Sequence, residues 1–297
     1  MSQDVYPVKP HIAERAHINS LEEYKRLYRL SLDNPEWFWA EQAKAVSWYH
    51  PWQVVFDADY EEVDFAWFSG GRLNASFNCV DRHLATLGDR TAIIWAQDEP
   101  GQYTHISYRE LKHQVCRLAN VLLSHGVRKG DRVCIYLTMM PQLVYAMLAC
   151  ARIGAIHSVV FGGFASGSLA TRIDDAKPVL IVSSDAGMRG GKAVPYKHLL
   201  DEAIELSENK PAKVLMVDRG LVKDSNKVEG RDVDYATLRA QHIDAQVPCE
   251  WMESSEPSYI LYTSGTTGKP KGVQRDTGGY AVALASSMKH IYCGGEG

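Results

Sequence analysis

The chain has 297 residues, of which 23% are charged and 45% hydrophobic, and a formal net charge of −4. This is the composition of a globular protein with one large or two ordinary domains, and it excludes a disordered chain. The mildly acidic balance lacks the basic footprint of a general nucleic-acid-binding protein. Six cysteines, none of them in a C-x-x-C pair, are too few for a disulfide scaffold and argue against a zinc or iron–sulfur site.

The first residues carry neither the basic nor the apolar segment of a signal peptide. The stretch 133–151 has no charge and has the length of a membrane span. However, Pro141 lies near its middle and its first half is β-like, so a buried strand, a turn and a buried helix account for it better. We therefore expect a cytoplasmic protein without a membrane segment.

Residues 1–60 are expected to form a helical N-terminal arm. Ser20, followed three residues later by a glutamate, forms a capping box that opens a first helix. Asn34 as N-cap and Pro35 at the first helical position open a second. The aromatic and glycine-rich stretch 50–75 is expected to be an irregular connection.

From about residue 88, short apolar strands alternate with helices, which predicts an α/β fold with a parallel sheet built from βαβ units. The first helix of this region is capped at Ser107 and ended by Gly126. The expected strands are 92–96, 132–137, 158–161, 178–183, 213–217 and 259–262, and the other helices are 141–153, 168–176 and 196–206.

The strongest motif is YTSGTTGKPKG at 262–272, where a strand runs into a loop of hydroxyls, glycines and lysines. Glycines let the backbone turn its N–H groups toward an anion, while hydroxyls and lysines bind phosphate oxygens. The spacing is not that of a Walker A loop. The alternative is a flexible polar turn. The candidate ATP phosphate-binding residues are Thr263, Ser264, Gly265, Thr266, Thr267, Gly268, Lys269 and Lys271.

A second motif, RGGK at 189–192, places two cations on a backbone with no side chain between them. Arginine can grip a phosphate as a fork and lysine as a point charge. The alternative is an exposed glycine turn with two solvated charges.

The 262–272 string resembles the phosphate-binding loop of the adenylate-forming superfamily. Further segments are similar to the short-chain AMP-forming acyl-CoA synthetases, and the resemblance covers essentially the whole chain. Within this family, 172–178 and 274–284 are more similar to members that activate propionate than to those that activate acetate. The other similar segments are WFW at 37–39, NCVDRH at 78–83, GDRV at 130–133, ACARIGAIH at 149–157 and VVFGGF at 159–164.

The resemblance implies that the protein ligates a short-chain carboxylate to CoA through an acyl-AMP intermediate, with release of AMP and pyrophosphate. Its small-molecule partners would be ATP with Mg²⁺, CoA, and propionate, or alternatively acetate. It also implies a CoA site at the second motif and at an aromatic residue with close backbone beside it. The candidate CoA-binding residues are Arg189, Gly190, Gly191, Lys192, Phe161 and Gly163.

Members of this family are about twice as long as this chain. The resemblance therefore implies that 61–297 is the first, incomplete part of the AMP-binding domain, and that the acyl pocket, the metal ligand and the C-terminal lid with its catalytic lysine lie downstream. No catalytic residue or metal ligand is expected within the chain, which we expect to be inactive alone. An uncovered sheet edge predicts self-association, and the protein could also be a homo-oligomer.

Three alternatives remain. The chain alone could be a non-catalytic nucleotide- or CoA-binding module. A peptide-synthetase adenylation domain would share the phosphate loop, although the 189–192 motif and the arm argue against it. A nicotinamide dehydrogenase is disfavoured, because no G-x-G-x-x-G follows a strand. His157 is expected to be a satisfied core histidine, and Asp174 and Asp175 to lie on a solvated face.

Overall fold

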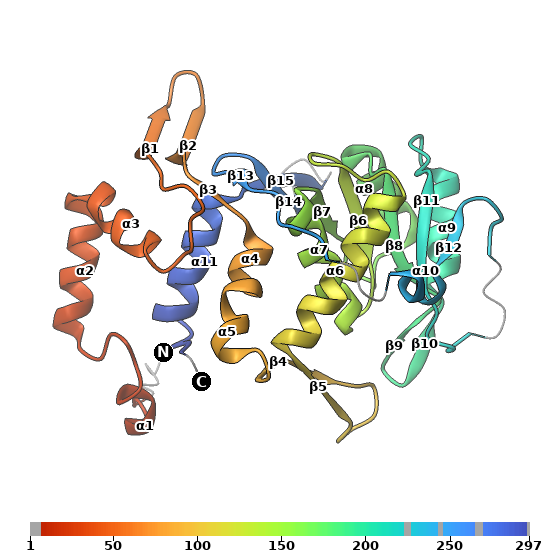
Figure 1. Ribbon diagram of the computed structural model, residues 1–297, viewed down its shortest axis with the longest axis horizontal. Helices are drawn as coiled ribbons and strands as arrows, with labels where there is room; N and C mark the ends of the chain where they lie inside the picture. Colours follow the sequence, from red (N-terminus) through yellow and green to blue (C-terminus); the bar gives the residue numbers. More distant parts are fainter. Residues whose placement is uncertain (1–6, 223–226, 243–245, 265–269, 296–297) are drawn as a thin grey trace, which may run out of the picture. The chain divides into compact units, whose positions relative to one another are not determined.

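The computed structural model describes residues 7–222, 227–242, 246–264 and 270–295. The chain divides into two compact units (Figure 1). Unit 1 comprises Met1–Leu73, Glu253–Ser255 and Thr277–Gly297, and unit 2 comprises Asn74–Met252 and Glu256–Asp276.

Unit 2 is built on a seven-stranded sheet with the order β12-β11-β8-β6-β7-β14-β15. Neighbouring strands are parallel except for β14 and β15, which form an antiparallel pair. The predicted α/β class with a parallel sheet is therefore confirmed. The strands are β6 (Arg132–Tyr136), β7 (Ile156–Val159), β8 (Leu180–Ser184), β11 (Lys213–Val217), β12 (Asp232–Asp234), β14 (Pro257–Thr263) and β15 (Lys271–Asp276).

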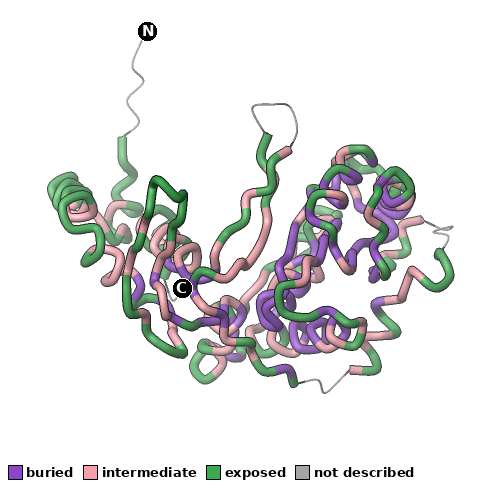
Figure 2. The backbone as a smooth tube through the Cα atoms, turned by 90° about the horizontal axis from the view of Figure 1, so that it is seen from above, coloured by how far each residue is buried: buried purple, intermediate pink, exposed green. Residues whose placement is uncertain are grey.

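Helices cover both faces of this sheet. Alternate residues of each strand point to opposite sides, and apolar residues on both sides are buried against helices. On β6, Val133 and Ile135 face the core shared with α6, α7 and α10, whereas Cys134 and Tyr136 face the core shared with α8 and α9. In Figure 2 the buried positions of unit 2 gather along these strands and the packed helix faces. The helices are α6 (Tyr108–Ser124), α7 (Pro141–Ile153), α8 (Ser166–Ala176), α9 (Tyr196–Leu206) and α10 (Tyr235–Gln241).

The helix ends follow the sequence signals. The Ser107 hydroxyl accepts the Glu110 backbone N–H and caps α6. Pro141 opens α7, and Gly154 ends it in the left-handed conformation, with φ 72°. The uncharged stretch 133–151 is thus a strand, a turn and a helix, as predicted. Among the described residues, no helix is both long enough and apolar enough to cross a membrane.

One predicted strand of the series does not join the main sheet. β4 (Thr91–Ala96) pairs antiparallel with β5 (Tyr103–Ser107) in a separate two-stranded sheet. The expectation that it belongs to the parallel βαβ series is therefore wrong. The apolar run at 92–96 has the pattern of a buried strand. The pattern does not show which strand it pairs with, and its partner is the neighbouring strand β5.

Unit 1 contains the predicted helical arm and an additional hairpin. The Ser20 hydroxyl accepts the Glu23 N–H, and the Asn34 side chain accepts the Trp37 N–H, so both predicted N-caps are confirmed. The Glu23 carboxylate, which a capping box would direct back to Ser20, instead accepts from Arg26. The irregular connection expected at 50–75 is wrong, because β1 and β2 form an antiparallel hairpin there. The elements are α1 (Pro10–Ala13), α2 (Leu21–Asp33), α3 (Pro35–Ala43), β1 (Val54–Asp59), β2 (Asp64–Ser69), β3 (Arg72–Leu73) and α11 (Gly278–His290), with β13 (Met252–Glu253) at the boundary between the units.

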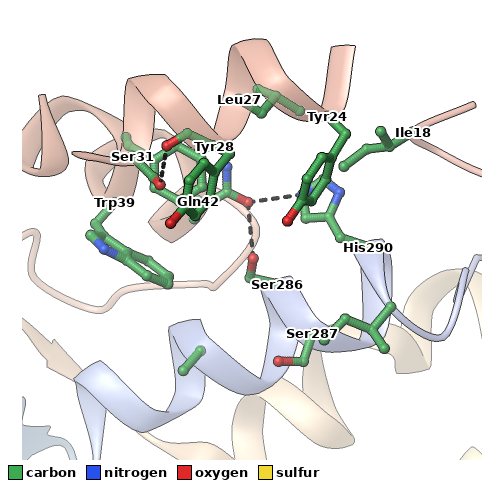
Figure 3. A pocket seen from close by; sticks show the side chains of 13 residues that line it. Ile18, Tyr24, Leu27, Tyr28, Ser31, Trp39, Gln42, Ser286, Ser287 and His290 are labelled. Carbon is green, nitrogen blue, oxygen red and sulfur yellow. Dashed lines mark hydrogen bonds between the residues drawn. The ribbon is translucent and has the colours of Figure 1, made fainter. Parts of the chain in front are cut away.

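A cavity of about 320 Å³ lies within unit 1 between α2, α3 and α11 (Figure 3). Its walls are mostly apolar and aromatic, including Tyr24, Tyr28 and Trp39. The Gln42 side-chain oxygen accepts the Ser286 hydroxyl at 3.2 Å and lies 3.1 Å from Nε2 of His290.

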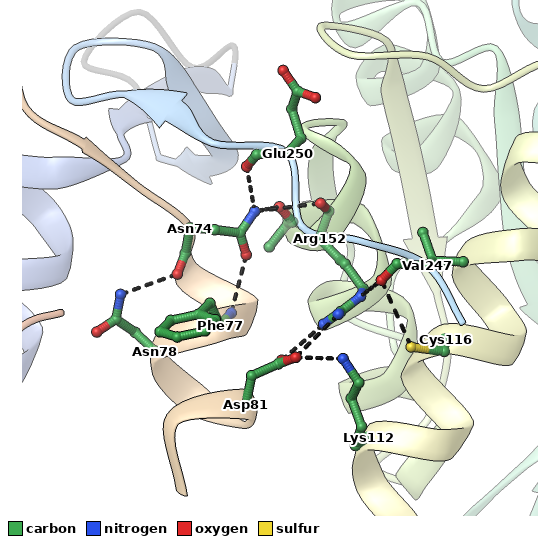
Figure 4. A network of polar contacts seen from close by, with 10 residues as sticks. Asn74, Phe77, Asn78, Asp81, Lys112, Cys116, Arg152, Val247 and Glu250 are labelled. Atoms are coloured by element: carbon green, nitrogen blue, oxygen red, sulfur yellow. Dashed lines mark hydrogen bonds and ion pairs between the residues drawn. The ribbon is translucent and has the colours of Figure 1, made fainter. Parts of the chain in front are cut away.

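A buried polar network joins the start of unit 2 to its main body (Figure 4). The Asn74 amide donates to the carbonyls of Ala151 and Glu250, both at 2.7 Å. Asp81 accepts from Arg152 at 2.8 Å and also from Lys112. The short elements at this point are α4 (Ala75–Cys79), η1 (Asp81–His83) and α5 (Leu84–Leu87).

Candidate functional site

The candidate residues follow the carboxyl ends of strands that are neighbours in the sheet. The ends of β8, β6, β7 and β14 meet at one edge, because these strands are parallel and adjacent. In open α/β sheets, ligands bind in the crevice outside this edge. The topology therefore brings both predicted motifs to the same side of unit 2.

The first motif begins where β14 ends and continues where β15 begins. Thr263 and Lys271 are cross-strand partners, so the structure brings the two ends of the motif together. Thr263, Ser264 and Lys271 are exposed at this end of the hairpin. The other five predicted phosphate-binding residues, Gly265, Thr266, Thr267, Gly268 and Lys269, lie outside the described residues.

The second motif is a tight hairpin formed by β9 (Gly187–Arg189) and β10 (Lys192–Val194). Gly190 and Gly191 make the turn with φ values of 57° and 75°, a pair of left-handed conformations that favours glycine at both positions. Arg189 and Lys192 are direct cross-strand partners and both are exposed. The hairpin thus presents two cations from one face.

The structure brings Phe161, Gly163 and Arg189 together. A methyl group on Gly163 would lie 2.8 Å from Nη1 of Arg189 and 2.5 Å from the Phe161 ring. Any larger residue would require the Phe161 ring or the Arg189 guanidinium to move. Phe161 is 64% exposed, although it follows a buried strand. An exposed ring beside open backbone and a cation is suited to a stacked base with a nearby phosphate.

A tyrosine supports this loop from behind. The Tyr196 side chain packs against Gly162 and Gly187, where added methyl groups would lie 2.1 Å from its hydroxyl oxygen and 2.9 Å from its ring, respectively. It also stacks on Tyr136 with a centroid separation of 5.0 Å. Burial raises the pKa of the Tyr196 hydroxyl, against the opposing effect of its hydrogen bond with Thr138. The sequence pattern did not point to this residue, although the Gly162–Gly163 pair signals a close approach.

Tyr262, at the end of β14, connects the first motif to α8. Its hydroxyl donates to the Asp175 carboxylate at 2.6 Å. Burial, and then this contact with Asp175, raises the pKa of Tyr262, so the hydroxyl stays protonated. Asp175 is exposed, as expected for a solvated face, but the expectation misses this bond. Asp174 likewise accepts the Asn209 N–H at 2.8 Å.

His157 is buried, as expected, and stacks on Tyr259 with a centroid separation of 5.4 Å. The expectation of a fully satisfied histidine is wrong, because among the described residues its Nδ1 has no hydrogen-bond partner. Burial lowers the pKa of His157 to about 4, so the ring is neutral at pH 7. A neutral imidazole within the sheet gives no sign of a catalytic role.

The chain matches two neighbouring families along its length. Residues 80–296 match the AMP-binding enzyme family, and residues 24–79 match the acetyl-coenzyme A synthetase N-terminus. A propionate–CoA ligase of Escherichia coli strain K12 is 54% identical over 275 residues, covering 92% of this chain and 43% of that protein. Acetyl-coenzyme A synthetase 2 of Pseudomonas aeruginosa is 49% identical over 290 residues, covering 97% of this chain and 44% of that protein.

The structure also resembles a solved structure, the acetoacetyl-CoA synthetase from Streptomyces lividans. The two have a TM-score of 0.81 at 28% sequence identity, covering 94% of this chain and 42% of that one. The chain therefore spans less than half the length of each of these three relatives. Its fold is that of the corresponding part of an adenylate-forming enzyme.

Proposed function

The chain belongs to the AMP-binding enzyme family, and from this premise we propose that the complete protein is an ATP-dependent ligase that joins a short-chain carboxylate to CoA. Propionate is the favoured acid, because segments 172–178 and 274–284 are more similar to members that activate propionate. Acetate is the alternative, since the similar proteins include an acetyl-CoA synthetase as well as a propionate–CoA ligase. In this proposal, residues 1–60 are an N-terminal arm, residues 61–297 are the first part of the AMP-binding domain, and the protein works in the cytoplasm.

One observation carries the CoA part of the proposal. Phe161 and Gly163 lie together after β7 and Arg189 lies on the later strand β9, but all three converge on one surface, where a ring, open backbone and a cation adjoin. The nucleotide end of CoA offers an adenine to stack and a 3′-phosphate to bind. The cross-strand pair Arg189 and Lys192, with Gly190 and Gly191 between them, supplies the phosphate-binding cations.

The reaction would proceed in two steps. A carboxylate oxygen attacks the α-phosphorus of ATP, and the bond from that phosphorus to the bridging oxygen breaks, which releases pyrophosphate. The CoA thiol, losing its proton, then attacks the acyl carbonyl and AMP leaves. Attack on a free carboxylate is slow, whereas the acyl phosphate anhydride has a good leaving group.

The residues of this chain would contribute mostly by binding and orienting phosphates in the first step. Thr263, Ser264 and Lys271 lie at the end of the β14–β15 hairpin, where they would contact the phosphates that leave as pyrophosphate. Among the described residues, no group of three side chains is suited to a metal ion. By resemblance to the family, Mg²⁺ would enter the reaction together with ATP.

Two alanine variants of the full-length protein test the division of roles. Lys271→Ala should slow propionate-dependent ATP–pyrophosphate exchange and leave the KM for CoA near normal. Arg189→Ala should raise the KM for CoA far more than the KM for 3′-dephospho-CoA, because only CoA carries the phosphate that this cation binds. Equal effects of Arg189→Ala on both thiols, or an effect of Lys271→Ala on the KM for CoA alone, would contradict the assignment.

A further inference from the structure

Arg172 is a buried cation on α8. Its residue is 7% exposed, and its Nη1 donates to the Ser168 carbonyl at 2.6 Å and to the Ser168 hydroxyl at 2.8 Å. Within the described ranges, no carboxylate lies at ion-pair distance from it. Burial of a charge without an anionic partner is costly, so other contacts must stabilise this guanidinium.

Two aromatic rings provide these contacts. The guanidinium carbon lies 4.3 Å from the Phe164 ring centroid and 5.3 Å from the Tyr262 ring centroid. Both distances are within the range of cation–π attraction, and a planar guanidinium stacks on rings where an ammonium cannot. Arg172 therefore holds two rings that come from different segments of the chain.

Each ring belongs to one of the two candidate binding segments. Phe164 packs edge-on against Phe161 with a centroid separation of 5.8 Å, and Phe161 is the exposed ring of the proposed CoA surface. Tyr262 directly precedes Thr263, where the strand leads into the phosphate-binding motif. Its hydroxyl is fixed by Asp175, which lies one helical turn after Arg172.

We propose that Arg172 is a positioning residue that couples the ATP end of the site to its CoA end. This inference rests on the proposed ligase function. A displacement of Tyr262 when the phosphates bind moves the guanidinium, and through Phe164 it moves the Phe161 ring. Because coupling between two binding sites is reciprocal, occupation of the CoA surface acts on the β14 end by the same amount.

The test uses the full-length protein and separates the two partial reactions. Propionate-dependent ATP–pyrophosphate exchange reports the KM for ATP without CoA, and thioester formation from added propionyl-AMP reports the KM for CoA without ATP. Arg172→Lys keeps the positive charge but loses the planar stack. We expect it to raise both KM values about tenfold, with a smaller change in kcat.

Thr171→Ala is the matched control on the same helix. Thr171 is exposed, and among the described residues its hydroxyl donates only to the Gly167 carbonyl of the same helix, at 3.0 Å. This variant should leave both KM values unchanged. A purely structural role for Arg172 would lower the Tm of Arg172→Lys without moving the two KM values together.

If Arg172→Lys does not fold, variants of the two rings provide the test. Tyr262→Leu should raise mainly the KM for ATP, and Phe164→Leu should raise mainly the KM for CoA. In the double variant the changes in the two KM values should be non-additive, because both rings act through one guanidinium. Additive effects in the double variant would overturn the coupling but not the ligase function. The same holds if a folded Arg172→Lys changes only one of the two KM values, or neither. Absence of exchange in the unmodified full-length protein would instead overturn the proposed function.

Discussion

Asp81 accepts hydrogen bonds from two cations in the interior of unit 2. The side chains of Arg152, Asp81 and Lys112 are 3%, 14% and 17% exposed, and Arg152 also donates to the Val247 carbonyl (Figure 4). Burial alone would raise the pKa of the Asp81 carboxyl, but the bonds from Arg152 and Lys112 hold it below its usual value. The aspartate therefore stays ionised and compensates the buried arginine.

Removal of that charge should strongly destabilise the chain. Asp81→Asn leaves Arg152 buried without its anion, and we expect a loss of about 3 kcal/mol in the free energy of unfolding. Asp89→Asn is the control, because Asp89 pairs with Arg109 at 3.0 Å on the surface, with the aspartate side chain 88% exposed. Denaturant unfolding of both variants checks this. Comparable losses for the two would show that burial does not decide the cost.

A single added methyl group at Gly163 should affect mainly the CoA part of the site, rather than the ATP part. Gly163→Ala introduces a methyl group at 2.5 Å from the Phe161 ring and 2.8 Å from Nη1 of Arg189, so both side chains must move. We expect a several-fold higher KM for CoA in the full-length protein and a smaller effect on ATP–pyrophosphate exchange.

Gly167→Ala is the control for this variant, since an added methyl group there meets no atom within 4 Å. It should leave both activities unchanged. The CoA assignment fails if Gly163→Ala has no effect on the KM for CoA, or if it slows exchange to the same extent.

At the scale of elements, local signals were sufficient where a helix starts at a proline or a capping residue and ends at a glycine. α7 begins at Pro141 and ends before Gly154, as predicted from those two residues. α9 and β11 also have the predicted bounds. β7 begins at Ile156, two residues before the expected start, because the apolar run there continues into the exposed Phe161.

Most of the strands that the sequence did not reveal belong to antiparallel pairs, although β12, which is parallel to β11, and the helix α10 were also not predicted. The β1–β2 hairpin lies in a stretch without strict alternation, and its strands are only partly buried, so the period-two signal is weak. β5 and β15 depend on a partner strand for their identity. Strand pairing depends on tertiary structure, and the periodicity of residues along one strand does not show which strand it pairs with.

The candidate site also has a part that the sequence predicts and a part that only the structure shows. Phe161, Gly163 and Arg189 could be predicted by resemblance, because each lies in a short recognisable motif, and the structure shows that they meet. Arg172 and Tyr262 could not, because nothing in the sequence shows that α8 packs against the end of β14. The sequence therefore predicted the groups that would contact ligands, but not the contacts that hold those groups in place.

For the chain as a whole, α11 presents an apolar stripe. Leu284 and Met288 lie on α11, Ile291 and Tyr292 directly follow it, and all four are about half exposed or more. Contiguous apolar surface of this kind promotes association. We expect the 297-residue chain to self-associate in size-exclusion chromatography with light scattering. The double substitution Leu284→Glu and Met288→Glu should lower the measured molar mass of the particle.

Ile94→Glu is the control, because Ile94 is an exposed apolar residue on β4, outside this stripe. It should leave the mass unchanged. A monomeric profile of the unmodified chain at all concentrations would contradict the prediction.

The most direct test of the ligase proposal is propionate-dependent ATP–pyrophosphate exchange. It should be measured in parallel on the 297-residue chain and on the same reading frame extended to its stop codon. We predict exchange in the extended protein only, faster with propionate than with acetate. Absence of exchange in both forms would contradict the ligase function, and the residues around Thr263 and Arg189 would then have to be interpreted as a binding site alone.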